Sequence, residues 1–276
     1  MSSQPLLGLV LAGGRSTRMQ RDKAAIAYHG RETQLETAMK LLAGRVDRAF
    51  VSMRADQADD PVRAAWPRIV DRGDVEGPIA GISAALAEHP DAAWLVLACD
   101  LPFLDAATLD YLIVNRDRER DATAFRSSHD GLPEPLCAIY EPRALAAIAA
   151  HVAGGRNCPR KFLINANTRL LDPLNPHALD NVNTVAEYGA AMSALDTLEI
   201  RVQYYALLRE QAGRSVETLA TRARTPRELY AELAAKYPFT LPSEMLRVAV
   251  NAEFGDWSQP LKAGDAVVFI PPVAGG

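Results

Sequence analysis

Two consecutive glycines follow the first apolar run of the chain. Residues 6–11 are continuously apolar, as expected for a strand covered on both faces, and Gly13 and Gly14 come just after them. Glycines let a backbone approach a phosphate or base closely, with amides free to donate. Four cations then stand within nine residues, namely Arg15, Arg18, Arg21 and Lys23. The segment predicts a polyphosphate site, although a turn with solvated arginines is the alternative, and its spacing fits neither a Walker loop nor a dinucleotide fingerprint.

Two aspartates stand where later predicted strands end. Asp100 follows residues 94–99, and Asp71 follows residues 68–70. The carboxyl ends of parallel strands meet at one sheet edge, so both carboxylates are expected near the glycines. A strand-end carboxylate can hold Mg²⁺, although such an aspartate is also an ordinary turn former. The convergence of these segments is a stronger signal than any one of them.

The elements that would position these residues alternate between strands and helices up to about residue 192. Thr33 and Glu36 form a capping box at one predicted helix start, while Pro78 and Asp105 suit the starts of two more. Strands separated by helices imply an α/β fold, a mainly parallel sheet with helices on both faces.

The pattern changes near residues 193–198. Residues 199–205 alternate polar and apolar side chains, as in a half-buried strand, and residues 216–219 could return antiparallel to it. Thr225 and Glu228 form a further capping box. We therefore predict two domains, residues 1–194 and a small α+β domain over residues 198–276.

The C-terminal sequence is unusual. A predicted strand over residues 266–270 runs into Pro271 and Pro272, which cannot extend a ladder, and the sequence finishes on Gly275 and Gly276. A terminal pair of glycines is thin and free of side chains, so it can thread into another protein's active site.

Composition excludes several classes of protein. With 49% hydrophobic and 23% charged residues the chain is globular, and a net charge of −4 argues against a bulk basic surface for nucleic acid. No apolar run approaches the roughly 20 residues that span a bilayer, so no membrane partner is expected. The three cysteines form neither a disulfide framework nor a zinc spacing, which favours packed thiols and a cytoplasmic location. The alternating charges of residues 116–121 predict a solvated helix end.

The motifs of the first domain together resemble the molybdenum cofactor guanylyltransferase family. The resemblance covers about residues 5–192. It rests on LAGGRSTRM at 11–19 with Asp22 and Lys23, on Asp71, on GPIAG at 77–81, on CDLP at 99–102 and on NVNT at 181–184. It implies a Rossmann-like nucleotide-binding fold that transfers GMP from GTP to molybdopterin with Mg²⁺.

The resemblance also implies roles for individual residues. Lys23 and Arg18 would neutralise phosphates, Asp100 would hold the metal, and these three would be the catalytic residues. Asn181 and Asn183 would face the pterin. The nucleotide would be contacted by Leu11, Ala12, Gly13, Gly14, Lys23, Ser52, Asp71 and Asp100.

The second domain resembles the small sulfur-carrier subunit of molybdopterin synthase, which is ubiquitin-like, with a β-grasp fold. The resemblance covers about residues 198–276 and rests on residues 202–210, residues 249–251 and the ending PPVAGG. It implies that Gly276 is adenylated by an activating enzyme and converted to a thiocarboxylate. The implied partners are that enzyme and the large subunit of molybdopterin synthase.

The combined interpretation is a fusion of two steps of molybdenum cofactor biosynthesis. One alternative keeps the enzyme and changes its substrates, giving a cytidylyl- or sugar-phosphate nucleotidylyltransferase. A second alternative is a non-catalytic nucleotide-binding module with a ubiquitin-like interaction domain. Gln20 keeps this second alternative open, because the family usually has glycine after the methionine.

Overall fold

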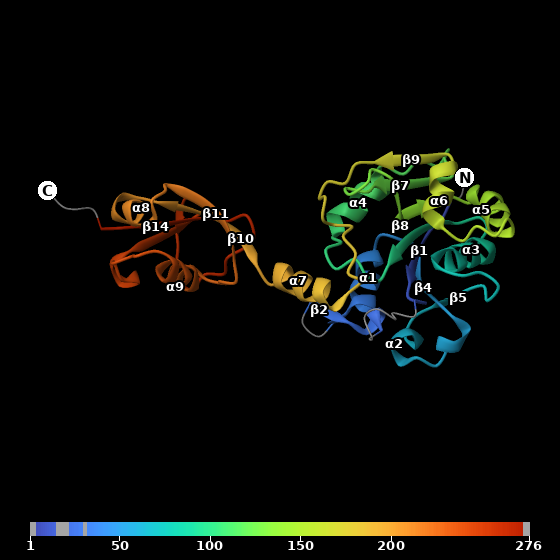
Figure 1. Cartoon of the computed structure of the whole chain (residues 1–276), viewed down its shortest axis with the longest axis horizontal. Coiled ribbons are helices and arrows are strands. Elements are labelled where there is room, and N and C mark those ends of the chain that lie inside the picture. The colour runs from blue at the N-terminus through green and yellow to red at the C-terminus, as the bar shows by residue number, and fades with distance from the viewer. Residues whose placement is uncertain (1–3, 15–21, 30–31, 273–276) are drawn as a thin grey trace. The chain divides into compact units, whose positions relative to one another are not determined.

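The computed structural model describes residues 4–14, 22–29 and 32–272 (Figure 1). Two compact units make up the chain, Met1–Ala191 and Met192–Gly276. Helix α7 (Val185–Leu195) carries the chain from the large unit into the small one.

The large unit is built on a seven-stranded sheet in the order β5-β4-β1-β6-β8-β7-β9. The strands are β1 (Leu6–Leu11), β4 (Arg48–Met53), β5 (Arg68–Val70), β6 (Ala93–Ala98), β7 (Ala122–Arg126), β8 (Pro133–Tyr140) and β9 (Thr168–Leu171). Strand β8 pairs antiparallel with both of its neighbours, whereas the other neighbouring pairs are parallel. The predicted mainly parallel sheet is therefore confirmed. A separate hairpin joins β2 (Ala27–His29) to β3 (Glu32–Thr33).

Helices cover both faces of this sheet (Figure 1). Strand β1 shows why, since Val10 faces one apolar core with Leu35 of α1, while Leu9 faces the other with Ile79 of α3. The predicted capping box of Thr33 and Glu36 begins α1. The helices of the large unit are η1 (Lys23–Ala25), α1 (Gln34–Leu42), η2 (Ala55–Gln57), α2 (Pro61–Ala64), α3 (Pro78–Glu88), α4 (Ala106–Val114), α5 (Ala144–Ala153) and α6 (Pro159–Asn165).

A buried ion pair corrects one expectation from the sequence. Arg116 follows α4, and its guanidinium donates to both carboxylate oxygens of Glu141, at 2.6 and 2.8 Å. The two side chains are only 6% and 1% exposed, so the prediction of a solvated segment is wrong for Arg116. Alternating charge along the chain could not reveal a partner 25 residues away.

The small unit has a five-stranded sheet in the order β11-β10-β14-β12-β13, with β10 and β14 parallel at its centre. Strand β11 returns antiparallel to β10, as predicted, and the small α+β fold is confirmed. Its elements are β10 (Leu198–Tyr204), α8 (Ala206–Ala212), β11 (Val216–Thr221), α9 (Pro226–Lys236), η3 (Ser243–Met245), β12 (Arg247–Val250), β13 (Glu253–Phe254) and β14 (Ala266–Ile270).

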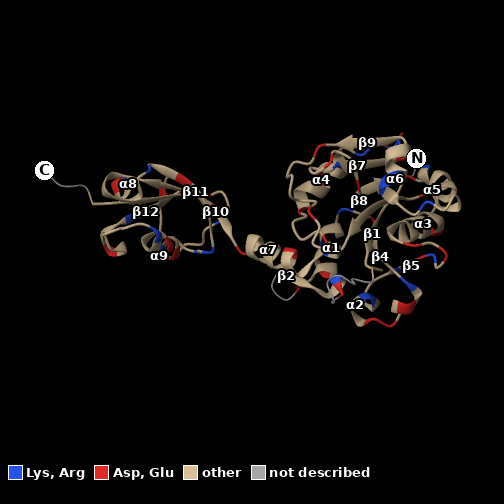
Figure 2. Cartoon of the chain, in the orientation of Figure 1, with Lys and Arg blue, Asp and Glu red and all other residues tan. Residues whose placement is uncertain are grey.

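Three further observations concern the distribution of charge, the burial of the cysteines and the length of the apolar helices. Figure 2 shows acidic and basic segments interspersed along each unit. Cys99 and Cys137 are buried as expected, but Cys158 is exposed at the start of α6, which contradicts the expectation of packed thiols there. Over the described ranges, no helix is long and apolar enough to cross a membrane.

Candidate functional site

Three segments far apart in the sequence meet at Lys23. Its ammonium group donates to Asp100 Oδ2 at 2.8 Å and to Asn183 Oδ1 at 2.6 Å. Lys23 opens η1, Asp100 follows β6, and Asn183 precedes α7. A backbone bond from the amide of Val182 to the carbonyl of Asp100, 3.1 Å long, holds the last two segments together. Three residues with different predicted roles therefore form one cluster: Lys23 for the phosphates, Asp100 for the metal and Asn183 for the pterin. Asn181, which was also predicted to face the pterin, is exposed.

The second oxygen of Asp100 lacks a hydrogen-bond partner. Oδ1 is buried and has no hydrogen-bond partner among the described residues. An unsatisfied buried carboxylate oxygen is costly, and a bound cation would relieve that cost. The described residues contain no group of three acidic, histidine or cysteine side chains that could enclose a metal ion. Mg²⁺ often binds one or two carboxylates, with water and substrate phosphates completing its shell, so this donor set fits Mg²⁺.

A second carboxylate lies at the ends of β4 and β5. Ser52 Oγ donates to Asp71 Oδ1 at 2.5 Å, since the paired strands bring Ser52 opposite Ile69, two residues before Asp71. Burial raises the pKa of Asp71, although the Ser52 hydrogen bond and the charge of Arg54 act in the opposite direction. This environment favours a ligand that brings positive charge or hydrogen-bond donors to Asp71.

Two glycines are required around Asp71 because there is no space for side chains. A Cβ on Gly13 would lie 2.5 Å from Asp71 Oδ2. A Cβ on Gly81, inside α3, would collide with Ser52 Oγ and lie 3.0 Å from Asp71 Oδ1. The glycine loop, β4, β5 and α3 therefore pack directly against this carboxylate.

The glycine loop presents free backbone donors. The amide of Ala12 is used, because it donates to the carbonyl of Ser52 at 3.0 Å. The amides of Gly13 and Gly14 have no partner within the part of the chain that the structure describes. Leu11 and Gly13 are partly exposed, Gly14 is exposed, and Ala12 is buried. Unpaired amides beside a lysine form a site suited to an anion.

Two arginines contact this loop, and sequence reasoning missed Arg63. Arg63 donates to the carbonyl of Ala12 at 3.0 and 2.6 Å, and Arg54 donates to the carbonyl of Gly13. No local signal could identify Arg63, because it lies 51 residues from Ala12 in the sequence.

Some predicted residues lie outside the described residues. These are Arg18 and the terminal Gly275 and Gly276, with Arg15, Gln20 and Arg21. Among the described residues, the site joins a cation, two carboxylates and free amides at the carboxyl ends of β1, β4, β5 and β6. Such an edge can bind a polyphosphate together with a divalent cation.

Comparisons with known proteins agree with this chemistry. Residues 8–170 match a family model described as "MobA-like NTP transferase domain", and residues 202–276 match the ThiS family. These matches confirm the two resemblances predicted from the sequence.

Individual relatives support the same assignment. A "Molybdenum cofactor biosynthesis bifunctional protein" of Synechocystis is 36% identical over 189 residues, which are 68% of this chain and 54% of the relative, so the match spans about half of that protein. A "Probable molybdenum cofactor guanylyltransferase" of Natronomonas pharaonis is 32% identical over 205 residues, covering 70% of this chain and 93% of that protein. The crystal structure of molybdopterin-guanine dinucleotide biosynthesis protein A from Archaeoglobus fulgidus shares the fold, with a TM-score of 0.56 at 21% identity, over 67% of this chain and 96% of that one.

Proposed function

The chain belongs to the MobA-like NTP transferase family, and we propose that its large unit transfers GMP from GTP to molybdopterin, releasing pyrophosphate. The observation that carries this proposal is the cluster of Lys23, Asp100 and Asn183, with one Asp100 oxygen unpartnered beside a loop of free amides. The family match supports the reaction class, and the cluster supports the choice of residues that would perform it.

The reaction requires positioning and charge neutralisation more than covalent chemistry. A phosphate oxygen of the pterin attacks the α-phosphorus of GTP, a new P–O bond forms, and the bond to the β-phosphate breaks. The amides of Gly13 and Gly14 donate to nucleotide oxygens, and Lys23 neutralises phosphate charge. Asp100 would hold Mg²⁺, which supplies further charge neutralisation when bound.

The remaining residues of the site have supporting roles. Ser52 and Asp71 line the nucleotide side with Leu11 and Ala12, and Ser52 orients the Asp71 carboxylate through their hydrogen bond. Asn181 and Asn183 face the pterin side. Arg18 is assigned to the phosphates from its place in the sequence.

For the small unit we propose sulfur transfer through its C-terminus. The Gly276 carboxylate would be adenylated by an activating enzyme with loss of pyrophosphate, and a sulfur donor would then displace AMP to leave a thiocarboxylate. The partners would be this activating enzyme and the large subunit of molybdopterin synthase. The ThiS-family match over residues 202–276 supports the assignment.

The test of nucleotidyl transfer uses the full chain with molybdopterin, Mg²⁺ and GTP, and measures pyrophosphate. GTP should be consumed and molybdopterin guanine dinucleotide formed, with CTP a poor competitor. Preferred use of CTP would favour the cytidylyl alternative, and absence of pyrophosphate with every nucleotide would favour a non-catalytic module.

The test of the carrier measures intact mass after incubation with an activating enzyme, ATP and a sulfur donor. The expected product has one oxygen of the terminal carboxylate replaced by sulfur. An unchanged mass with an activating enzyme that is active on its own carrier would contradict the assignment.

A further inference from the structure

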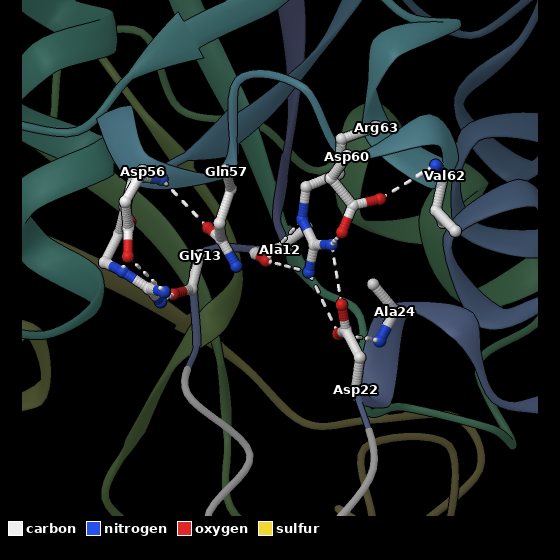
Figure 3. Close-up of polar contacts among 10 residues, drawn as sticks. Ala12, Gly13, Asp22, Ala24, Asp56, Gln57, Asp60, Val62 and Arg63 are labelled. Carbon is white, nitrogen blue, oxygen red and sulfur yellow. Dashed lines mark hydrogen bonds and ion pairs between the residues drawn. The ribbon is translucent and has the colours of Figure 1, made fainter.

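Arg63 is a charged residue with no exposed surface. Its side chain is 0% exposed, although it lies on α2 near the rim of the sheet. Figure 3 shows its guanidinium between Ala12, Asp22 and Asp60. Two nitrogens donate to the carbonyl of Ala12, at 3.0 and 2.6 Å. Two contacts, at 2.6 and 2.9 Å, reach both oxygens of Asp22, and a third carboxylate contact, at 2.7 Å, reaches Asp60.

The contact with Ala12 sets the direction of the glycine loop. In a trans peptide the carbonyl of one residue and the amide of the next point to opposite sides. Because Arg63 holds the Ala12 carbonyl, the Gly13 amide points away from Arg63. Arg54, itself paired with Asp56, holds the Gly13 carbonyl, so the Gly14 amide points away from Arg54. Both arginines therefore hold carbonyls and leave the following amides unpaired.

The contact with Asp22 sets the position of Lys23. Asp22 Oδ1 accepts a hydrogen bond from the amide of Ala24 at 3.0 Å and thereby caps η1, whose first residue is Lys23. One rigid guanidinium therefore joins the glycine loop to the turn that carries the lysine (Figure 3).

A purely structural explanation accounts poorly for this arrangement. A buried ion pair is weak evidence for stability, because well-packed apolar residues are often at least as stable. The planar fork of arginine supplies donors at fixed angles, which lysine cannot reproduce. The geometry thus suits orientation of two binding elements more than packing.

We propose that Arg63 is a positioning residue for nucleotidyl transfer, which sets the Gly13 amide and Lys23 against the same phosphate chain. This inference rests on the proposed function of the large unit. Arg63 acts through Ala12 and Asp22 and does not itself contact the substrate.

The test compares Arg63→Lys with Arg116→Lys. Arg116 is a matched control, because its buried guanidinium also makes a bidentate pair with a carboxylate, that of Glu141, and has no contact with the cluster. Both variants should lose thermal stability. Only Arg63→Lys should lose roughly 10- to 100-fold in kcat/KM for pyrophosphate release from GTP, since small misplacements have effects of this size. Equal kinetics in the two variants would overturn the proposal.

A second variant tests the proposal if Arg63→Lys does not fold. Asp22→Asn keeps an oxygen that can cap η1 but loses one of the two charged partners of Arg63. It should show a smaller kinetic loss in the same direction, and wild-type kinetics would overturn the proposal.

Hydrogen exchange, which does not require catalytic turnover, tests this inference independently of the proposed function. The Ala12 amide, bonded to Ser52, should exchange its hydrogen at least about tenfold faster in Arg63→Lys than in the wild type, and at the wild-type rate in Arg116→Lys. If the wild type releases no pyrophosphate but this exchange difference is found, the proposed function fails and the positioning of the loop stands. Equal exchange rates in all three proteins would overturn the positioning role.

Discussion

Two carboxylates, one in each unit, have pKa values that are shifted in opposite directions. Burial raises the pKa of Asp71, and a hydrogen bond from Ser52 and the charge of Arg54 only partly offset it. Burial also acts to raise the pKa of Glu217 in the small unit, but hydrogen bonds from Tyr204, Lys236 and Tyr237 outweigh it and lower the pKa. Asp71 accepts a side-chain hydrogen bond from Ser52. Glu217 accepts hydrogen bonds from three side chains.

The difference follows from where each unit is proposed to do its chemistry. The large unit must bind a substrate with side chains and amides at a sheet edge, so some polar groups there lack partners, including Asp100 Oδ1. The small unit is proposed to react at its terminal carboxylate, so its interior can satisfy Glu217 completely without loss of function. The unsatisfied oxygen of Asp100 therefore fits a sheet edge that binds a substrate.

Deletion of Gly275 and Gly276 should distinguish the activities of the two units most clearly. Sulfur transfer should be lost completely, because the reacting group is the terminal carboxylate itself, while pyrophosphate release from GTP should stay at the wild-type rate. Thiocarboxylate formation and pyrophosphate release are measured on the same preparation. Retained sulfur transfer would end the carrier assignment, and loss of both activities would contradict independent units.

Asp100→Asn should nearly abolish nucleotidyl transfer. Loss of a metal ligand removes several kcal/mol of charge stabilisation, which is at least about 100-fold in rate. Pyrophosphate release is measured across a Mg²⁺ titration. Asp105→Asn is the control, because it changes an exposed cap of α4 that asparagine serves equally well. Wild-type rates for Asp100→Asn at limiting Mg²⁺ would refute the metal assignment.

Lys23→Ala should weaken GTP binding much more than GMP binding. The lost charge-assisted contact is worth about 1.5–3 kcal/mol and is assigned to the phosphates. Dissociation constants for both nucleotides test this, with Lys40→Ala as a control at an exposed ion pair with Glu32. Equal weakening of both nucleotides would place Lys23 elsewhere than at the phosphates.

Glu217→Gln should destabilise the small unit by about 1–3 kcal/mol, because buried donors lose a charged acceptor. The folded pKa of Glu217 is lowered, so its stabilisation is complete above the ordinary value of 4.5 and is lost as the pH falls through the folded value. Denaturation at several pH values should show the variant and wild type converging in acid. Exposed Glu244→Gln serves as the control, and a pH-independent difference would contradict the network.

Asp71→Asn should have the smallest and the opposite effect on stability. Because its folded pKa is raised, ionised Asp71 opposes folding, and that penalty is complete above the folded pKa. The variant should therefore be slightly more stable than the wild type at pH 7, and the difference should vanish as the pH falls below 3.8. Weaker GTP binding should accompany the gain. Lower stability at pH 7 would show that Asp71 is a structural residue.

The sequence allowed prediction of features that depend on local patterns. The glycine loop, the strand-end aspartates and the capping box at Thr33 each occupy a few consecutive residues, and the parallel sheet then brings the segments together. Arg63 was missed and Arg116 was predicted wrongly, because their environments depend on partners 25 or more residues away. The roles of the individual site residues stay predictions.

The crowding around Asp71 restricts the order in which this site can change during evolution. A side chain at position 81 collides with Ser52, and one at position 13 lies 2.5 Å from Asp71. Gly81→Ala is therefore harmful while Ser52 keeps its hydroxyl, and removal of that hydroxyl relieves the shortest contact but leaves Asp71 Oδ1 and Leu11 Cδ2 each 3.0 Å away. The same holds for Gly13→Ala and the length of residue 71. The effect of a substitution at position 13 or 81 should thus depend on the side chains at positions 52 and 71, so a path of single substitutions that begins at residue 52 or 71 meets less crowding than one that begins at a glycine.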